Sequence, residues 1–487
     1  MKIIGRIREK RLLKNYLEGD KPEFLVVFGR RRAGKTFLIK EFFNGDFCFY
    51  CTGLESERAD VQLKSFHEAL NKYGSEPLPY KDNWFDAFTQ LTRLVENAPS
   101  GQKKVVFLDE MPWMDTHKSG FLTGLEYFWN SFASSRPDVL LIVCGSATSW
   151  IVKKLFRNTG GLYNRVTKQM HIRPFTLYEC EQFFRERDIA INRYEITESY
   201  MVFGGNPYYL DYFEKGLSFS QNVDQLCFSE NAPLKYEFDR LYGTLFDDPK
   251  GHIEIVRALA RKKSGLTRAE LLTESGHSNG GGFSRILSEL TESDFIRKYP
   301  TFSKKRRDAV YRLIDPFTLF YLRFIEKKST DTRYWSHNIT DPSHRAWAGL
   351  AFEQVCFAHI EQIKAALGIS GVYAEISSWR SKDNTGRKGL PPGHGRDGEP
   401  PGAQIDLVID RRDQVVNLCE CKYSIHEFVV TKEYERALRH KIAAFAEGTG
   451  ALKALHTTMV TTYGVKRNEY SGVVQSEVTM DGLFKDI

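Results

Sequence analysis

Three groups of residues have the types and the spacing that phosphate and metal chemistry require. The first is the run Gly29-Arg30-Arg31-Arg32-Ala33-Gly34-Lys35-Thr36, which fits the pattern G-x-x-x-x-G-K-[ST]. Its glycines let the backbone curl around a phosphate, so that N–H groups and the start of the next helix face the anion. Lys35 is then expected to reach the β- and γ-phosphates, and Thr36 to ligate Mg²⁺. The run predicts an ATP-binding loop.

The second group consists of polar residues that follow two apolar runs. Asp109 and Glu110 come directly after the apolar run 105–108, and Ser146 follows the run 139–144 and a glycine. A buried strand would deliver Asp109 to its carboxyl end, where ligands bind in open α/β sheets. We expect Asp109 to hold the Mg²⁺, Glu110 to polarise the attacking water and Ser146 to position that water. Solvated acids at a strand end and a simple turn serine are the alternatives.

The third group lies in the last quarter of the chain. Asp406 stands in the alternating stretch 404–410, and Glu420-Cys421-Lys422 ends the next strand-like stretch. Residues two apart in a strand point to the same face, so Glu420 and Lys422 would lie side by side, and Asp406 can join them from the adjacent strand. The two carboxylates could bind Mg²⁺, while Lys422 orients water or stabilises charge on a phosphate. A structural ion pair in an inactive fold is the alternative.

The elements that must position the first two groups alternate along the chain. Short apolar runs predict strands, the stretch after Lys35 and the stretches 57–73 and 83–97 predict helices, and residues 176–245 read as helical with a break at 204–207. Strands that alternate with helices imply an α/β fold with a parallel, doubly wound sheet. The predicted strands are 24–28, 47–51, 105–108, 139–144 and 170–172.

The middle of the chain combines helices with a basic hairpin. Thr267 and Glu270 have the spacing of a helix start, three glycines precede a helix over 283–293, and hairpin arms are predicted at 295–299 and 309–313. This order resembles a winged helix-turn-helix. That resemblance implies that Ser284, Arg285 and Ser288 face a DNA groove and that the turn contacts phosphates. A packing module with a solvated turn is the alternative. The basic residues of the turn are Lys304, Lys305, Arg306 and Arg307.

Composition limits the class of protein and locates the charge. The chain has 487 residues, 41% hydrophobic and 27% charged, which argues against disorder, a collagen or a coiled coil. Its longest apolar run is too short to span a bilayer, so we expect a cytoplasmic protein with no membrane partner. Eight cysteines do not make a disulfide scaffold. The net charge of +7 is concentrated between Arg261 and Arg312, where twelve basic residues meet six acidic ones.

These motifs together resemble known protein families. Over residues 1–210 the strand order, the Gly5-Arg6-x-x-Glu9 start and the stretch 161–165 resemble AAA+ and STAND-type P-loop ATPases. The resemblance implies that Arg165 is an arginine finger, acting in cis or on a neighbouring subunit through self-association; a surface arginine is the alternative. Glu353, in an apolar helix, joins Asp406, Glu420 and Lys422 in resembling the PD-(D/E)xK nuclease fold, and it is implied as a further metal ligand.

The whole order resembles a bacterial and archaeal ATPase family with four parts. It predicts a P-loop ATPase core over 1–190, a helical lid over 191–245, a winged helix-turn-helix over 246–330 and a restriction-endonuclease-like α/β domain over 331–487. Two functions follow as hypotheses. One is an Mg²⁺-dependent ATPase that acts on DNA and carries a nuclease site. The other is a STAND-like switch that nucleotide controls and whose C-terminal domain is inactive.

Overall fold

The protein is described by a computed structural model that divides into two compact units. The first unit comprises Met1–Pro174 with Asn206–Tyr208 and Glu292–Asp294, and the second comprises the remaining residues. The predicted division into four domains stays a prediction. The residues that the structure describes are 2–146, 148–156, 162, 164–246, 248–262, 264–302, 309–327, 329–381 and 403–487.

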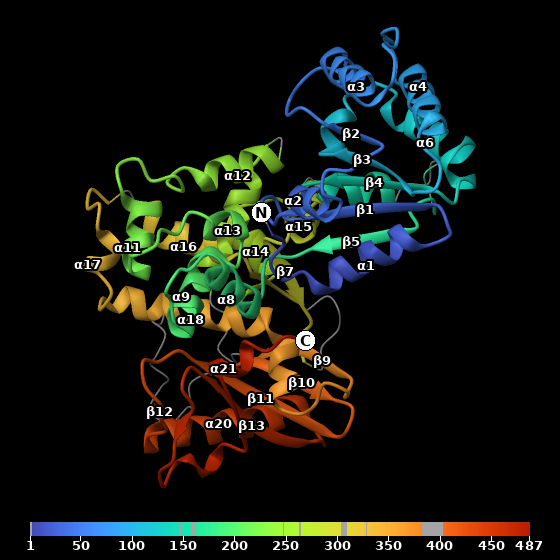
Figure 1. The fold of residues 1–487 in the computed structure, drawn as a ribbon. Coiled ribbons are helices and arrows are strands. Elements are labelled where there is room, and N and C mark those ends of the chain that lie inside the picture. Colours follow the sequence, from blue (N-terminus) through green and yellow to red (C-terminus); the bar gives the residue numbers. More distant parts are fainter. Residues whose placement is uncertain are drawn as a thin grey trace. The chain divides into compact units, whose positions relative to one another are not determined.

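The first unit is built on a five-stranded sheet in the order β2-β3-β4-β1-β5, with every neighbouring pair parallel. The parallel α/β fold predicted from the alternating runs is therefore confirmed. Because the strands are parallel, β1, β3 and β4 end at the same edge of the sheet (Figure 1). The strands are β1 (Glu23–Gly29), β2 (Phe49–Thr52), β3 (Lys104–Asp109), β4 (Val139–Gly145) and β5 (Lys168–Ile172).

Helices cover both faces of this sheet because alternate strand residues are apolar on both sides. Leu25 and Val27 pack in a core with α1 (Ile7–Glu18) and α2 (Lys35–Phe42). Phe24 and Val26 pack on the other face, in a core with three longer helices. These are α3 (Ala59–Tyr73), α4 (Trp84–Asn97) and α6 (Phe121–Ser131), and the short elements of the unit are α5 (Met111–Met114), a 3₁₀ turn (Ala133–Ser135), α7 (Thr148–Ile151) and a π-helical turn (Val152–Phe156).

The second unit begins with the predicted helical stretch. Side-chain caps fix two of its helix starts, since Thr176 and Asn192 each form a reciprocal capping box with a glutamate three residues on. Gly204 ends the second of these helices in a left-handed conformation. The helices are α8 (Leu177–Glu186), α9 (Arg193–Phe203), α10 (Pro207–Leu210), α11 (Phe219–Val223), the π-helical turn η3 (Asp224–Phe228) and α12 (Glu237–Leu245).

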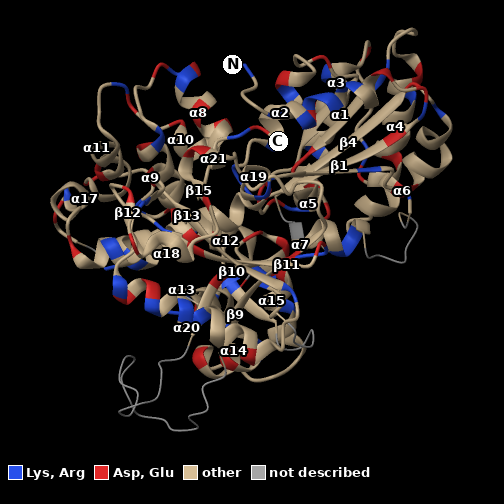
Figure 2. Ribbon diagram, turned by 90° about the horizontal axis from the view of Figure 1, so that it is seen from below, with Lys and Arg blue, Asp and Glu red and all other residues tan. Residues whose placement is uncertain are grey.

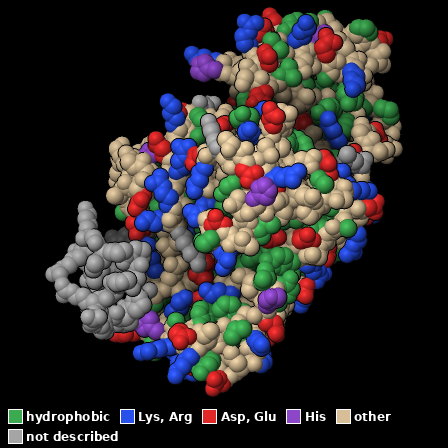
Figure 3. Space-filling model, turned by 90° about the vertical axis from the view of Figure 1, so that its left-hand side faces the viewer, with side chains coloured by type: hydrophobic (Ala, Val, Ile, Leu, Met, Phe, Trp, Pro, Cys, Tyr) green, Lys and Arg blue, Asp and Glu red, His purple; other side chains and the backbone are tan. Residues whose placement is uncertain are grey.

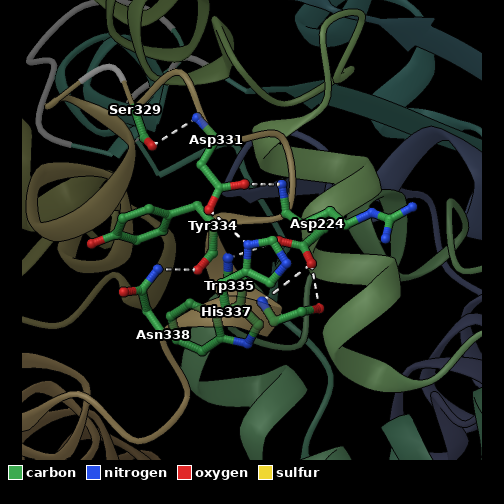
Figure 4. A network of polar contacts seen from close by, with 9 residues as sticks. Asp224, Ser329, Asp331, Tyr334, Trp335, His337 and Asn338 are labelled. Carbon is green, nitrogen blue, oxygen red and sulfur yellow. Dashed lines mark hydrogen bonds and ion pairs between the residues drawn. The ribbon is translucent and has the colours of Figure 1, made fainter.

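The buried carboxylate of Asp224 ties η3 to a helix more than a hundred residues further along the chain. It accepts hydrogen bonds from the N–H groups of Trp335 (2.7 Å) and Ser336 (3.2 Å) and from the Ser336 hydroxyl. These N–H groups lie in the first turn of α17 (Tyr334–His337), so Asp224 caps that helix across the fold (Figure 4).

The middle segment folds as three helices followed by a hairpin. Thr267 and Glu270 form the predicted capping box, and the predicted hairpin is confirmed because β7 and β8 pair antiparallel in a sheet of order β6-β8-β7. The elements are α13 (Lys250–Ala260), β6 (Leu266–Thr267), α14 (Arg268–Ser275), α15 (Gly281–Glu292), β7 (Ile296–Tyr299) and β8 (Val310–Leu313).

The last segment surrounds a mixed sheet of order β15-β13-β11-β10-β9, in which β9, β10 and β11 are antiparallel and β11, β13 and β15 are parallel. Helix α20 covers the face of Val408 and Leu418, and α18 packs on β11 from the side of Cys419 and Cys421. The strands are β9 (Ala374–Arg380), β10 (Gln404–Arg411), β11 (Val415–Lys422), β12 (Phe428–Val429), β13 (Ala454–Thr461), β14 (Val465–Lys466) and β15 (Ser476–Thr479).

The helices of this segment precede and flank the sheet. Among the residues that the structure describes, no helix has both the length and the apolar character needed to cross a membrane. The helices are α16 (Pro316–Phe320), a π-helical turn (Tyr321–Ile325), α17, α18 (Pro342–Ala358), α19 (Ile360–Ala366), α20 (Lys432–Thr449), a 3₁₀ turn (Ser471–Val473) and α21 (Met480–Leu483).

Candidate functional site

The loop between β1 and α2 has the backbone of a phosphate cradle. Gly29, Arg32 and Gly34 all have positive φ angles, of 135°, 69° and 86°. A Cβ atom on Gly29 would lie 2.2 Å from the carbonyl oxygen of Ile172, so only glycine fits where the strand turns into the loop. The loop then leads directly into α2, which begins at Lys35.

Three predicted nucleotide and metal residues meet at this loop. The Lys35 side chain is 4% exposed, and its Nζ donates to the carbonyl oxygens of Gly29 (3.0 Å) and Arg30 (2.8 Å). The Thr36 hydroxyl donates to Asp109 Oδ1 at 2.9 Å, although the two residues are far apart in sequence. A hydroxyl beside a carboxylate is the hard oxygen set that Mg²⁺ prefers, so these residues fit the predicted metal.

Burial shifts the ionisation of these groups. It lowers the pKa of Lys35, and it raises the pKa of Asp109, which the nearby Glu110 raises further. Each shift reflects the cost of holding a charge away from water. A cation held at Asp109 would offset that cost for the carboxylate.

Glu110 and Ser146, which were predicted separately, are hydrogen-bonded to one another. The N–H and the hydroxyl of Ser146 both donate to Glu110 Oε2, at 3.1 Å and 3.0 Å. Glu110 has a left-handed backbone, with φ of 44°, at the point where β3 ends. The end of β4 therefore orients the carboxylate that we predicted to act on water.

The other loop residues have distinct surroundings. Arg31 forms an ion pair with Glu55 at 3.2 Å, and the Arg32 guanidinium lies 4.1 Å from the ring centre of Tyr208. Arg30 and Ala33 are buried within the loop. The Ala33 carbonyl accepts a hydrogen bond of 3.1 Å from the buried Arg6. Arg6 belongs to the predicted N-terminal signature, and no spacing in the sequence indicated that it contacts the loop.

The backbone next to Arg165 lies near the end of β1 that is opposite to the nucleotide loop. Arg165 precedes Thr167, whose N–H donates to the Phe24 carbonyl oxygen near the start of β1. The loop begins at Gly29, at the other end of that strand, which is about 16 Å away for five residues of extended chain. Arg165 is exposed, its backbone lies toward the end of β1 opposite the loop, and its role as an arginine finger stays a prediction.

The structure brings Asp406, Glu420 and Lys422 together on one face of the second sheet. Leu407 pairs with Cys419 across antiparallel strands, which places Asp406 beside Glu420. Both carboxylates are almost completely buried, at 4% and 3% exposure. Burial raises the pKa of Glu420, and the neighbouring Asp406 raises it further.

Two residues of α20 also reach Glu420, and neither belongs to the predicted motif. Lys441 Nζ donates to Glu420 Oε1 at 2.7 Å, and the Tyr434 hydroxyl donates to Oε2 at 3.3 Å. Lys422 Nζ lies further off, 3.9 Å from Oε2. No local sequence signal links a helix lysine to a strand acid twenty-one residues before it.

Glu353 does not complete this cluster as we had expected. Among the described residues, no three His, Cys, Asp or Glu side chains are grouped so that they could hold a metal ion. Helix α18 packs on the opposite face of β11, and Glu353 instead lines a cavity with Arg312 and Tyr299. The expected set of Glu353, Asp406 and Glu420 is therefore reduced to the last two.

The predicted DNA-facing residues of α15 lie along one side of that helix, while Phe283, Leu287 and Leu290 pack inward. The Arg285 side chain is 72% exposed, with its Nε 3.6 Å from Glu289. Ser284 accepts a hydrogen bond from Arg268 (3.0 Å) and donates to the Gly280 carbonyl oxygen (3.2 Å), and Ser288 is partly buried.

The predicted hairpin turn lies outside the described part of the chain, with its basic residues Lys304, Lys305, Arg306 and Arg307. Basic and acidic residues elsewhere are distributed over many helices (Figure 2), and side chains of both signs are interspersed on the face in Figure 3. The visible charge on that face therefore does not form a single field of one sign.

Comparisons with known proteins found a family that matches the first part of the chain and a relative that matches most of it. Residues 4–213 match a family described as an ATPase domain predominantly from Archaea. The uncharacterized protein MJECL04 of Methanocaldococcus jannaschii is 25% identical over 381 residues, which cover 77% of this chain and 81% of that protein.

Two solved structures are also similar to this chain. The Walker-type ATPase paby2304 of Pyrococcus abyssi has 20% identity and a TM-score of 0.47, covering 66% of this chain and 96% of that one. The ORC2 protein of Aeropyrum pernix has 14% identity and a TM-score of 0.40, covering 67% and 94%. The family match spans the phosphate loop, Asp109 and Glu110, so residues 4–213 are similar to that ATPase domain over the whole predicted nucleotide site.

Proposed function

We propose that this chain is an Mg²⁺-dependent ATP hydrolase that acts on DNA. The observation that carries the first half is the hydrogen bond between Thr36 Oγ1 and Asp109 Oδ1, at 2.9 Å. It joins the end of β3 to the start of α2 at the place where a nucleotide phosphate would meet the loop. Glu110 follows Asp109 directly and so borders the same place.

The residues around the phosphate loop each have a distinct role in this proposal. Bound Mg²⁺ would supply positive charge to the phosphate oxygens, held by the Thr36 hydroxyl and the Asp109 carboxylate. Lys35 would exchange its carbonyl partners for phosphate oxygens. Glu110 would accept a hydrogen bond from the attacking water and orient it, with Ser146 fixing the direction of its carboxylate.

ATP binding and turnover test the phosphate-loop assignment. Lys35→Ala is expected to lose ATP binding, because the phosphate charge would lose its buried counter-charge. Lys40→Ala is the matched control: Lys40 lies on the same helix, 4.3 Å from the ring centre of Tyr50, and should keep wild-type binding. Wild-type affinity in Lys35→Ala would show that this loop does not bind the phosphates.

The DNA half of the proposal is supported by the middle segment. The exposed Arg285 lies on a helix that precedes a hairpin, and the basic run 304–307 joins the two arms of that hairpin in sequence. A helix for base edges and a basic hairpin for phosphates are the two parts of winged-helix DNA recognition. Turnover of ATP measured with and without DNA separates this function from a nucleotide-controlled switch of the STAND type.

The salt dependence of DNA affinity tests the role of the basic run. Replacing Lys304 to Arg307 by alanine should weaken binding and flatten the plot of log affinity against log salt by about 0.9 for each phosphate that the protein no longer neutralises. Replacing the exposed Arg8 and Arg11 of α1 by alanine is the control and should leave the slope unchanged. An unchanged slope in the first variant would remove the hairpin from the DNA interface.

A second candidate function, a metal-dependent nuclease, is supported by Asp406, Glu420 and Lys422 lying on one sheet face. Nicking of plasmid DNA with Mg²⁺ or Mn²⁺ should be present in the wild type and lost in Lys422→Ala. Equal cleavage by both proteins would place the activity elsewhere. Absence of nicking by either protein would instead support the alternative, a regulator whose C-terminal domain does not cut and in which the two lysines near Glu420 form structural ion pairs.

A further inference from the structure

The carboxylate of Glu420 is held by a helix as well as by its own strand. Lys441 Nζ lies 2.7 Å from Oε1, whereas Lys422, the lysine of the strand motif, lies 3.9 Å from Oε2. The shorter contact therefore belongs to the residue that the motif does not include. Tyr434, seven residues before Lys441 on the same helix, donates to the second oxygen at 3.3 Å.

Lys441 is placed by a well-anchored helix. Thr431 caps the start of α20 by accepting a hydrogen bond from the Tyr434 N–H, and Leu438 and Phe445 of the same helix are fully buried in the domain core. The Lys441 side chain is only 26% exposed. Its ammonium group therefore lies at Glu420 because the helix directs it there.

The four charged groups around this point balance. Asp406 and Glu420 are buried carboxylates, and in the described part of the chain the ammonium groups of Lys422 and Lys441 lie close to Glu420. Buried carboxylates need a compensating charge, and either a lysine or a divalent cation can supply it. A cation that bound Oε1 of Glu420 would have to approach the oxygen that the Lys441 ammonium group contacts.

We propose that Lys441 takes the place of a divalent cation on Glu420, so that metal binding there requires the Lys441 ammonium to move away. The inference rests on the second candidate function, because it concerns the same pair of carboxylates. Mg²⁺ binds carboxylate oxygens at about 2.1 Å, and an ammonium group 2.7 Å from Oε1 both occupies that approach and repels the cation. The absence of a third acidic ligand in the described part of the chain adds to this barrier.

Mn²⁺ binding to the full, nucleotide-free chain, measured by solution EPR, tests the proposal. Lys441→Met is expected to bind Mn²⁺ about tenfold more tightly than the wild type, the effect of removing one competing charge-assisted hydrogen bond. Lys453→Met is the matched control. Lys453 is 28% exposed and donates to Asp410 at 2.6 Å, and neither residue contacts Glu420, so its removal should not increase the Mn²⁺ binding that Glu420→Gln abolishes.

A double variant distinguishes a wrong role for Lys441 from the absence of a metal site at Glu420. Lys441→Met with Glu420→Gln should lose the added Mn²⁺ binding. If the wild type and Lys441→Met bind Mn²⁺ equally and Glu420→Gln abolishes that binding, the metal site stands and the role of Lys441 is wrong. If neither protein binds Mn²⁺ at Glu420, both the site and this inference are wrong.

A measurement on the wild type does not depend on the folding of any variant. Saturating Mn²⁺ should increase the acetylation of Lys441 by an amine reagent several-fold, because a displaced ammonium group becomes accessible. Lys453, with similar burial and a similar ion pair, serves as the internal control in the same digest. Unchanged reactivity of Lys441 in Mn²⁺ would overturn the proposal.

Discussion

At the scale of single residues, the ATP site depends on pairs that hold one another in place. Thr36 is hydrogen-bonded to Asp109, and Ser146 is hydrogen-bonded to Glu110. The two residues predicted to hold Mg²⁺ are therefore joined to each other, and so are the two residues predicted to act on water, without any ligand. Such links reduce the freedom of the side chains that must meet a phosphate and a water. Preorganised groups of this kind are effective because they need little rearrangement during the reaction.

Changing Glu110 should separate binding from hydrolysis. Glu110→Gln keeps the shape and the hydrogen bonds from Ser146 but removes the charge that polarises water, so we expect turnover to fall by about 10²- to 10⁴-fold with ATP affinity kept. Steady-state turnover and equilibrium binding measure the two effects. Ser146→Ala is the comparison, and it should cost much less because the Ser146 N–H still donates to the carboxylate. Full activity of Glu110→Gln would assign the water to another group.

At the scale of elements, the second unit is joined by caps that act between distant segments. Asp224 of η3 caps α17, and His359 after α18 meets the start of α8. The Leu177 N–H donates to His359 Nε2 at 2.9 Å, so the ring proton must be on Nδ1, which donates to the Val355 carbonyl oxygen at 2.8 Å. Burial lowers the pKa of His359 to about 4, which keeps the ring neutral.

Removing the Asp224 carboxylate should destabilise the second unit. Asp224→Ala leaves the N–H groups of Trp335 and Ser336 buried without an acceptor, which we expect to cost about 2–4 kcal/mol of unfolding free energy. Thermal or denaturant melting measures the loss. Asp331→Ala, which removes a more exposed acid bonded to His337 in the same network, should lower the melting temperature far less. Equal losses would show that the cap is not the source of stability.

At the scale of the whole chain, the second unit gathers segments that the sequence predicted as separate domains. Arg380 of β9 is paired with Glu270 of α14, and Thr301 forms a β-bridge with Ser378. Tyr194 of α9 stacks on Tyr423, directly after the end of β11, with ring centres 5.1 Å apart. These contacts join the helical stretch, the middle segment and the C-terminal sheet into one compact unit.

The packing of α9 on the C-terminal sheet predicts a pH dependence of stability. Burial raises the pKa of Glu198 to about 7, so between its unfolded value near 4.5 and pH 7 the folded state holds a proton that the unfolded state has released. Stability should therefore fall as pH rises through this window. Glu198→Gln should remove this part of the dependence and raise the melting temperature at pH 8. Glu447→Gln, on the exposed side of α20, should do neither.

The sequence by itself determined the local parts of this protein. Four short apolar runs and the stretch 170–172 predicted the five strands of the first sheet, and the glycine pattern predicted the loop, because these signals lie within a few neighbouring residues. The spacing of Asp406, Glu420 and Lys422 likewise predicted their shared face, since strand alternation is a local rule.

Only the tertiary structure decided which distant groups meet. Strand order placed Asp109 beside Thr36, and helix packing gave Glu420 a lysine from α20 and placed Glu353 at a different cavity. The physical reason is that such contacts follow from how whole faces of helices and sheets pack together. No spacing along the chain encodes that packing, so a motif of the right residues can be assembled, shared or blocked by an element far away in the sequence.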